Sequence, residues 1–435
     1  MDDLEAIFAT SRKAGKAWAA TPGLRRQELL HQWLDRILAN VDDLAEAITL
    51  EMGKVLADAK GEVLHALKEA RFSVDEAARP IGEVMPSARV GLRNMTIRRP
   101  RGVIVASTPW NYPVLTPLRK LAPAFAHGNA VILKPSEVSP AAACILAELA
   151  QGILPAGLFQ IALGAGRVGA ALTGHPGADG VTFTGSVPTG RAVYEAAAAN
   201  LGAVQLELGG KNGIILHDAD DLEACLDEIV AGALENGGQR CTSLSRLLVQ
   251  RDLAPAATTG IAARMNRVRL GDGRTNQAEM GPMASEAHFQ RVQSAIAHGE
   301  AEGAQCVTDK TTSEPVGYFV RPTLFTGVTS DMALAREEVF GPVLSMLVYD
   351  TIDEALAILN SVDFGLSAAL YSNRNDVVQR FVSEAEAGML HVNHQTSIDT
   401  NMPFVGVKHS GVGAPSIGRS AINFYTTEHS VYIKS

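Results

Sequence analysis

The sequence predicts an α/β protein made of two doubly wound α/β domains and a small strand-paired element. Two observations predict the domains: short β-branched runs alternate with helical stretches over residues 103–208, and the alternation restarts after Asn212. Such alternation is typical of a parallel sheet with helices on both faces. The extra element is predicted by two stretches, residues 90–98 and 424–433, that alternate apolar and polar residues as half-exposed strands do.

The first 78 residues are expected to be helical, because apolar residues recur there at helical spacing, for example Leu30, Trp33, Leu34 and Ile37. Nothing in this region resembles a functional site. We therefore expect these helices only to pack on something larger.

The strands expected in the first domain are short and rich in β-branched residues, as buried strands are. They cover residues 103–107, 130–134, 158–163, 180–184 and 204–208. Helices are expected at residues 117–126 and 188–200, and Ser139-Pro140 begins another with a capping residue and a proline in its first turn. Ligands bind such sheets at the carboxyl ends of the strands, so a site is expected in the loops that follow them.

The second domain is expected to repeat this organisation. Its strands are predicted near residues 214–216, 247–249, 320–325, 343–348, 368–371 and 389–392. Its helices are predicted at residues 221–234, 254–265 and 288–302.

The two alternating stretches at residues 90–98 and 424–433 are expected to pair, within or between chains, because proteins normally pair or protect exposed strand edges. We interpret them as an assembly element. A homodimer or a homotetramer is therefore expected.

The composition argues against several classes of protein. The 435-residue chain has a formal charge of −9, which argues against a nucleic-acid partner. No apolar run approaches the ~20 residues that span a membrane. The four cysteines form no Cys-x-x-Cys pair, so neither a zinc site nor a disulfide framework is indicated. The acidic N-terminus lacks the pattern of a targeting signal, and a cytoplasmic, reducing location is expected.

The chemistry is expected between Glu207 and Cys241. Glu207 ends an apolar run, and Cys241 lies shortly behind Gly237 and Gly238. A glycine pair lets a substrate approach the backbone closely. The cysteine is a candidate nucleophile there, with Glu207 as the base or water activator. A cysteine hydrolase is a weaker interpretation, because no histidine in a recognisable motif accompanies Cys241.

Three loops after predicted strands carry further candidate residues. Lys134 and Glu137 could hydrogen-bond a ribose or a phosphate. Gly185-Ser186 ends a strand and opens a helix, whose N-terminus suits a pyrophosphate. The amide of Asn111, in a proline-rich loop, could donate to a developing oxyanion. Each of these motifs, taken alone, is also explained by an ordinary structural loop.

Taken together, seven motifs resemble those of the aldehyde dehydrogenase superfamily, in order, from about residue 10 to the end. They are Pro109-Trp110-Asn111, Lys134-Pro135-Ser136-Glu137, Phe183-Thr184-Gly185-Ser186, Glu207-Leu208-Gly209-Gly210-Lys211, Gly238-Gln239-Arg240-Cys241, Glu338-Val339-Phe340-Gly341-Pro342 and Pro403-Phe404-Val405-Gly406-Val407-Lys408-His409-Ser410-Gly411. The chain departs from the family at Val405, where a glycine is common, and at Ala414-Pro415, where Arg-Glu is usual.

The resemblance implies NAD(P)-dependent oxidation of an aldehyde to a carboxylic acid, with no metal. Cys241 would attack the aldehyde carbon, and the Asn111 side chain and the Cys241 backbone N–H would hold the oxyanion. The thiohemiacetal would give up a hydride, and Glu207 would activate the water that hydrolyses the thioester. Two alternatives remain open: an acylating enzyme that passes the acyl group to coenzyme A, and a non-catalytic nucleotide-binding or structural protein of the same fold.

The resemblance also implies the cofactor NAD, with NADP possible, and a Rossmann-like domain to bind it. Its expected ligands are Lys134, Ser136, Glu137, Gly185, Ser186, Glu338, Phe340 and Trp110. Similar proteins have three parts, which gives the expected organisation of this chain. A dinucleotide-binding domain would comprise residues 1–78 and 99–208, a catalytic domain residues 209–411, and an oligomerisation element residues 79–98 and 424–435.

The substrate is expected to be a small anionic semialdehyde such as succinic semialdehyde. In similar dehydrogenases that act on anionic aldehydes, an arginine and a tyrosine at the positions of Arg240 and Tyr112 meet the substrate's carboxylate or phosphate. A guanidinium suits this task because it presents a planar fork and stays charged. Ser397 and Ile398 are expected to line the same entrance. In the alternative interpretation, Arg240 pairs with a neighbouring carboxylate and only braces the cysteine loop.

Overall fold

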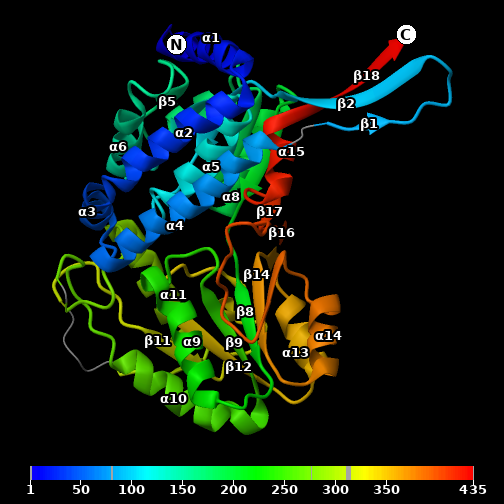
Figure 1. Cartoon of the computed structure of the whole chain (residues 1–435). Coiled ribbons are helices and arrows are strands. Elements are labelled where there is room, and N and C mark those ends of the chain that lie inside the picture. Colours follow the sequence, from blue (N-terminus) through cyan, green and yellow to red (C-terminus); the bar gives the residue numbers. More distant parts are fainter. Residues whose placement is uncertain (1, 80–81, 276, 310–314, 435) are drawn as a thin grey trace.

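The computed structural model describes residues 2–79, 82–275, 277–309 and 315–434, and Figure 1 gives its layout. Residue 1 of the expected dinucleotide-binding domain, residues 276 and 310–314 of the expected catalytic domain, and residues 80–81 and 435 of the expected oligomerisation element lie outside the described residues. Among the described helices, none combines the length and the apolar character needed to cross a lipid bilayer.

The N-terminal region is helical, as predicted. It forms α1 (Asp2–Ala20), α2 (Gly23–Leu38), α3 (Val41–Met52) and α4 (Leu56–Asp75). Its tryptophans anchor it to the helices that follow, because the buried indole N–H of Trp33 donates to the carbonyl of Leu146 (3.1 Å) and that of Trp18 to Phe125 (2.8 Å). These helices therefore cover the first sheet and share its core.

The first sheet has the strand order β17-β7-β6-β3-β4-β5. Its five parallel strands are the predicted ones: β3 (Val103–Ser107), β4 (Ala130–Lys134), β5 (Phe159–Ile161), β6 (Gly180–Thr184) and β7 (Ala203–Glu207). Its helices are α5 (Leu115–Ala126), α6 (Ala141–Ala150), α7 (Gly166–Thr173) and α8 (Val187–Ala198). The order places the loops after β3, β6 and β7 at one end of the sheet, where a ligand is expected.

The second sheet has the order β10-β11-β12-β9-β8-β14-β15. Its strands are β8 (Asn212–Leu216), β9 (Leu244–Gln250), β10 (Gln305–Cys306), β11 (Thr323–Thr326), β12 (Val343–Tyr349), β14 (Ser367–Tyr371) and β15 (Met389–Val392). All pairs are parallel except the edge pair of β10 and β11. The helices are α9 (Leu222–Leu234), α10 (Ala254–Asn266), α11 (Glu286–Ala301), α12 (Ala333–Arg336), α13 (Ile352–Asn360) and α14 (Asn375–Glu384). Two α/β units with parallel sheets confirm the predicted fold class.

The chain returns to the first sheet near its end. Strand β17 (Gly411–Val412) pairs antiparallel with β7, so that Gly411 lies opposite Glu207. The preceding strand β16 (Val407–Lys408) pairs with β13 (Phe364–Gly365) of the second unit. The expected end of the catalytic domain at residue 411 therefore falls on the first residue of a strand in the first sheet.

The third sheet, β1-β2-β18, extends away from the body (Figure 1). Strand β2 (Leu92–Pro100) pairs antiparallel with β18 (Thr426–Lys434) and with β1 (Val84–Met85), so the two alternating stretches pair within one chain. The predicted strand start at residue 424 is wrong, because Phe424 and Tyr425 belong to α15 (Ile422–Tyr425). Both side chains are buried, and two consecutive buried aromatic residues do not fit the alternation of a half-exposed strand.

Candidate active site

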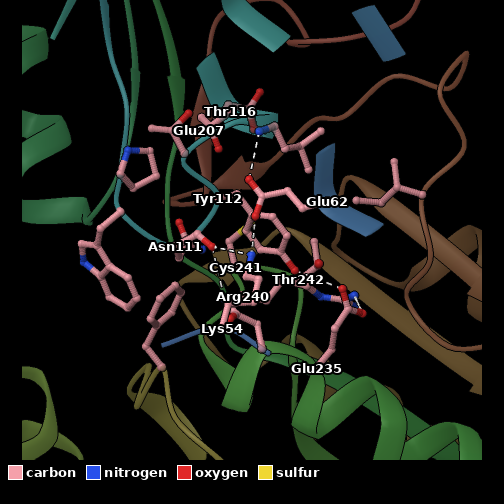
Figure 2. A pocket seen from close by; sticks show the side chains of 18 of the residues that line it. Lys54, Glu62, Asn111, Tyr112, Thr116, Glu207, Glu235, Arg240, Cys241 and Thr242 are labelled. Atoms are coloured by element: carbon pink, nitrogen blue, oxygen red, sulfur yellow. Dashed lines mark hydrogen bonds and ion pairs between the residues drawn. The ribbon is translucent and has the colours of Figure 1, made fainter. Parts of the chain in front are cut away.

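A cavity of about 570 Å³ is lined by Cys241, Glu207 and Asn111, the three residues predicted to be catalytic. Asn111 lies in the loop after β3, Glu207 is the last residue of β7, and Cys241 lies just before β9. The cavity thus lies where the carboxyl ends of the first sheet's strands meet the second unit. Figure 2 shows the labelled side chains of all three residues from close by.

Left-handed backbone upstream positions Cys241. Asn236, Gly237 and Gly238 have φ values of 54°, 65° and 72°. A Cβ on Gly238 would lie 2.2 Å from the carbonyl oxygen of Gly341, so only glycine fits there. The tight turn brings the partly exposed Cys241 to the cavity, and the Asn212 amide donates to its carbonyl (2.8 Å).

The electrostatics of the cavity disfavour a free thiolate at Cys241. Desolvation by burial raises the pKa of the thiol to about 11, and the charges of Glu338 and Glu207 add to that rise. Arg119 and Arg240 act in the opposite direction. The thiol is therefore protonated at neutral pH in the described site, and its attack on an aldehyde requires a proton acceptor.

Glu207 has the properties of such an acceptor. Its carboxyl group is buried, and its Oε2 has no hydrogen-bond partner among the described residues. Burial raises the pKa of Glu207, whereas the nearby cations of Lys120 and Arg119 oppose the rise. A carboxyl with a raised pKa and an oxygen without a partner, next to a cavity, is suited to take a proton from water.

The Asn111 side chain is fixed against the cysteine loop. Its amide nitrogen donates to the carbonyl oxygen of Gln239 (2.9 Å). The backbone carbonyl oxygen of Asn111 accepts from the Lys54 ammonium (3.0 Å) and from the Asn236 side-chain amide (3.2 Å). One N–H of the Asn111 amide is thereby used for positioning, and the second is left to donate to an oxyanion at Cys241.

Five of the eight residues predicted to bind the cofactor line the same cavity: Trp110, Gly185, Ser186, Glu338 and Phe340. Glu338 is partly buried and accepts the backbone N–H of Gly210 (3.0 Å). Phe340 has a left-handed backbone (φ 58°) and contacts Trp110 edge to face, with ring centroids 5.6 Å apart. Ser186 is the N-cap of α8 and uses its hydroxyl on Thr189 (3.0 Å), so it does not cap the helix.

This arrangement fits a dinucleotide. The first N–H groups of α8 have no side-chain cap, and an uncapped helix N-terminus attracts a pyrophosphate. Gly185 also lines the cavity, where an added Cβ would meet the Phe183 ring at 2.5 Å. The aromatic edges of Trp110 and Phe340 provide an apolar contact for a flat ring.

The other three residues predicted to bind the cofactor lie outside this cavity. Lys134 ends β4, and its ammonium contacts the exposed carboxylate of Glu137 (3.0 Å). The Ser136 hydroxyl accepts the backbone N–H of Val138 (3.2 Å). They belong to the same end of the sheet as Asn111, because β4 is the neighbour of β3, and their role at a ribose stays a prediction.

All four residues predicted to bind the substrate line the cavity. Arg240, however, is held by protein groups: its guanidinium forms an ion pair with Glu235 and donates to the Thr396 carbonyl (3.1 Å) and hydroxyl (2.9 Å). The Tyr112 hydroxyl donates to the same Glu235 carboxylate (3.0 Å; Figure 2). The structure therefore has the arrangement of the alternative interpretation, in which Arg240 pairs with a neighbouring carboxylate.

Helix α4 and Lys54, two residues before it, also contribute to the cavity, and the expectation that the first 78 residues contain no site residue is wrong. Lys54, Asp58, Glu62 and His65 all line it. Lys54 and Glu62 form a buried ion pair, and Glu62 also accepts the backbone N–H groups of Val114 and Leu115 at the start of α5. The i, i+4, i+7 spacing of Asp58, Glu62 and His65 on one helical face was the available signal. Such a polar face normally indicates a solvated surface.

A sequence profile described as Aldehyde dehydrogenase family matches residues 1–431. The chain is 35% identical over 440 residues to an alpha-ketoglutaric semialdehyde dehydrogenase of Bacillus subtilis (strain 168), which covers 100% of this chain and 90% of that protein. It is 38% identical over 432 residues to a betaine aldehyde dehydrogenase of Cereibacter sphaeroides (strain ATCC 17029 / ATH 2.4.9), with 99% and 89% covered. The crystal structure of betaine aldehyde dehydrogenase from Staphylococcus aureus in complex with NAD+ is similar with a TM-score of 0.96 at 29% identity, covering 100% and 88%.

Proposed function

The chain belongs to the aldehyde dehydrogenase family, and from this premise we propose that it oxidises a small polar aldehyde and releases the free carboxylic acid. As a member it is an NAD(P)-dependent oxidoreductase that acts on aldehydes. The proposal concerns how the acyl group leaves. The observation that carries it is the buried carboxyl of Glu207, whose Oε2 has no partner among the described residues and which lines the cavity together with Cys241.

In the proposed mechanism the Cys241 sulfur bonds to the aldehyde carbon, and the thiol proton passes to water, directly or by way of Glu207, which releases it before the second step. The Asn111 amide and the Cys241 backbone N–H hold the resulting oxyanion. When bound, oxidised NAD(P) would supply the acceptor for the hydride that leaves this carbon, and the carbon is then a thioester on Cys241. Glu207 then takes a proton from water, whose oxygen attacks the thioester carbon, and the thiolate of Cys241 leaves and is reprotonated.

Cavity residues are available to orient the cofactor for this step. The uncapped N-terminus of α8 at Ser186 would bind the pyrophosphate. Glu338 would accept hydrogen bonds from the ribose near the nicotinamide, and Phe340 would pack beside the ring. Lys134, Ser136 and Glu137 would bind the adenosine ribose at the end of β4.

Transfer of the acyl group to coenzyme A is the alternative. It needs no water activator, whereas Glu207 occupies such a position. Incubating the enzyme with an aldehyde and NAD(P), with and without coenzyme A, and identifying the product by mass spectrometry separates the two. We expect the free acid in both samples. A coenzyme A thioester, formed only when coenzyme A is present, would overturn the proposal, and absence of NAD(P)H would favour a non-catalytic protein.

Succinic semialdehyde, the substrate predicted from the sequence, requires Arg240 to accept its carboxylate. That anion would meet a largely buried guanidinium whose charge Glu235 already balances. The named relatives act on aldehydes of opposite charge, an oxo-acid semialdehyde and betaine aldehyde, so kinship does not choose between them. Succinic semialdehyde, as an anion, is a suitable probe of whether the cavity prefers a substrate of one charge.

We also propose that the enzyme is a homodimer or a homotetramer. Support comes from the third sheet, whose strands extend from the body and expose apolar side chains such as Tyr432 and Ile433. Exposed strand edges of this kind are normally paired.

A further inference from the structure

Glu235 occupies a central position among the polar groups of the cavity. It directly precedes the left-handed turn that leads to Cys241. One carboxylate oxygen accepts the Tyr112 hydroxyl (3.0 Å), and the other forms the ion pair with Arg240. Its side chain keeps 41% of its surface exposed, so this carboxylate contacts two substrate-site residues and still faces the open cavity.

Protein groups already use both terminal nitrogens of the Arg240 guanidinium. One terminal nitrogen contacts Glu235 and the other donates to Thr396. The Nε is buried and has no acceptor among the described residues, and only 10% of the side chain is exposed. A substrate carboxylate would therefore meet a largely buried guanidinium whose charge Glu235 already balances.

The other cations at this end of the cavity are also matched. Lys54 pairs with Glu62, and Arg119 pairs with Glu69 through two hydrogen bonds (2.7 and 2.8 Å). Arg291 also lines the cavity, but its charge acts on Glu338 and His288, at the end where the cofactor is expected.

Asp58 has no such partner. Its carboxylate is exposed and accepts no hydrogen bond from another side chain within the described part of the chain. Burial raises the pKa of Asp58, the Lys54 ammonium lowers it, and the charge of Glu235 raises it, so Asp58 lies close enough to Glu235 for the two carboxylates to repel each other. Lys54, Arg119 and Arg240 each pair with another carboxylate, so Asp58 is left without an ion-pair partner among the described residues.

We propose that Glu235 determines the charge of the accepted aldehyde: by holding Arg240 and lying near Asp58, it favours an ammonium group at the substrate's far end over a carboxylate. This inference rests on the proposed aldehyde oxidation. A substrate ammonium would donate to the remaining lone pairs of Glu235 and to Asp58. A substrate carboxylate would meet two like charges and a guanidinium that is already neutralised.

The test compares three aldehydes of similar length at neutral pH: 3-aminopropanal, butanal and succinic semialdehyde. We expect kcat/KM for the wild type to fall in that order. Glu235→Gln keeps the shape of the side chain and removes its charge. It should lower the ratio of kcat/KM for 3-aminopropanal over that for succinic semialdehyde by about ten- to a hundredfold, as expected for a charge-assisted contact. Asp58→Asn should lower the same ratio by a smaller factor.

Two controls separate the inference from trivial effects. Glu148→Gln removes an exposed carboxylate outside the cavity and should leave the ratio unchanged. In Glu235→Gln/Arg240→Ala, the gain of Glu235→Gln towards succinic semialdehyde should disappear, because that gain needs the released guanidinium.

Every outcome either supports or overturns the proposed charge preference. A wild type that prefers succinic semialdehyde, or a ratio that Glu235→Gln does not change while butanal is oxidised, overturns the inference and leaves the proposed function intact. If Glu235→Gln/Arg240→Ala keeps the gain in kcat/KM for succinic semialdehyde, then Glu235 does not act by neutralising Arg240. No oxidation of any of the three aldehydes by the wild type overturns the proposed function, and the inference with it.

Discussion

At the scale of single residues, Cys241 and Glu207 are both more protonated than the reaction requires. Burial raises the pKa of the Cys241 thiol to about 11, and it also raises the pKa of Glu207. Both groups are therefore less ionised than usual in the described cavity. The nucleophile and the base must act by exchanging protons with each other or with water, because neither starts as a stable anion.

The pH dependence of Cys241 alkylation measures the raised pKa of the thiol directly. The thiolate is the form that reacts with iodoacetamide. With a pKa of about 11, the thiolate fraction in the cofactor-free enzyme should still rise about tenfold for each pH unit between pH 7 and 9. We expect the rate of Cys241 alkylation, followed by peptide mass spectrometry, to rise accordingly. A rate that has levelled off near pH 7 would contradict the raised pKa.

Removing the carboxyl of Glu207 should separate the two halves of the reaction. Glu207→Gln should give a burst of NADH close to one equivalent per site, followed by a much slower steady state, because water can accept the thiol proton in the first step whereas the hydrolysis needs the base. Stopped-flow absorbance measures both phases. A variant without a burst would give Glu207 a role before hydride transfer, and full turnover would remove it from the mechanism.

The same carboxyl predicts a pH dependence. Burial raises the folded-state pKa of Glu207, and the carboxylate is the form that accepts a proton from water. Hydrolysis should therefore slow on acidification already within the neutral range, well above the ordinary glutamate pKa of about 4.3. The steady-state rate after the burst measures the hydrolysis. Its plot against pH should have a midpoint in the wild type and none in Glu207→Gln. If the steady-state rate of the wild type did not change down to pH 5, the raised pKa of Glu207 would be contradicted.

The sequence placed Cys241, Glu207 and Asn111 in one site because their motifs are local: each is fixed by the few residues beside it. It could not assign the partner of Arg240. The partner could be Glu235, five residues earlier, or the carboxylate of a substrate. Only the three-dimensional structure shows which of them contacts the guanidinium. The contributions of Asp58 and Glu62 were missed for a related reason, since charges on one face of an amphipathic helix look the same whether they face water or a cavity.

At the scale of elements, the buried strands were predictable and several helices were not. Runs such as β3 and β4 consist of buried β-branched and aliphatic residues bounded by loops, which left little choice. Helices α13 and α14 were not predicted. The aromatic residues at 424–425 were assigned to a strand because their burial against the first sheet is a tertiary effect that a short alternating pattern does not show.

The turn before Cys241 offers a test at this scale. Gly238→Ala should destabilise the fold by about 1–2 kcal/mol for the left-handed backbone and by about 1–3 kcal/mol more for the contact with Gly341. Gly152 is a matched control, because it has a similar φ (75°) and an added Cβ would meet nothing within 4 Å. Urea unfolding should show the larger loss for Gly238→Ala, together with lost activity. Equal losses would mean that the close approach to Gly341 does not constrain the cysteine loop.

At the scale of the whole molecule, the third sheet is an element with little to pack on. Strand β18 pairs only with β2 among the described strands, so its outer edge presents unpaired backbone groups. Side chains on it and on β1 are exposed although they are apolar: Tyr432 is 70% exposed, Ile433 47% and Val84 75%. An exposed edge of this length invites pairing with another chain, and a second copy is the partner that is always present.

We therefore expect a homodimer or a homotetramer in light scattering at micromolar concentration. Ile433→Lys should weaken the assembly, because the charge would be buried against the partner's apolar surface. Leu201→Lys is the control, since Leu201 is 95% exposed and lies in the turn before β7, outside this sheet. A wild-type monomer at that concentration would contradict the assembly. An oligomer that is equally stable in both variants would show that the subunits meet through another surface.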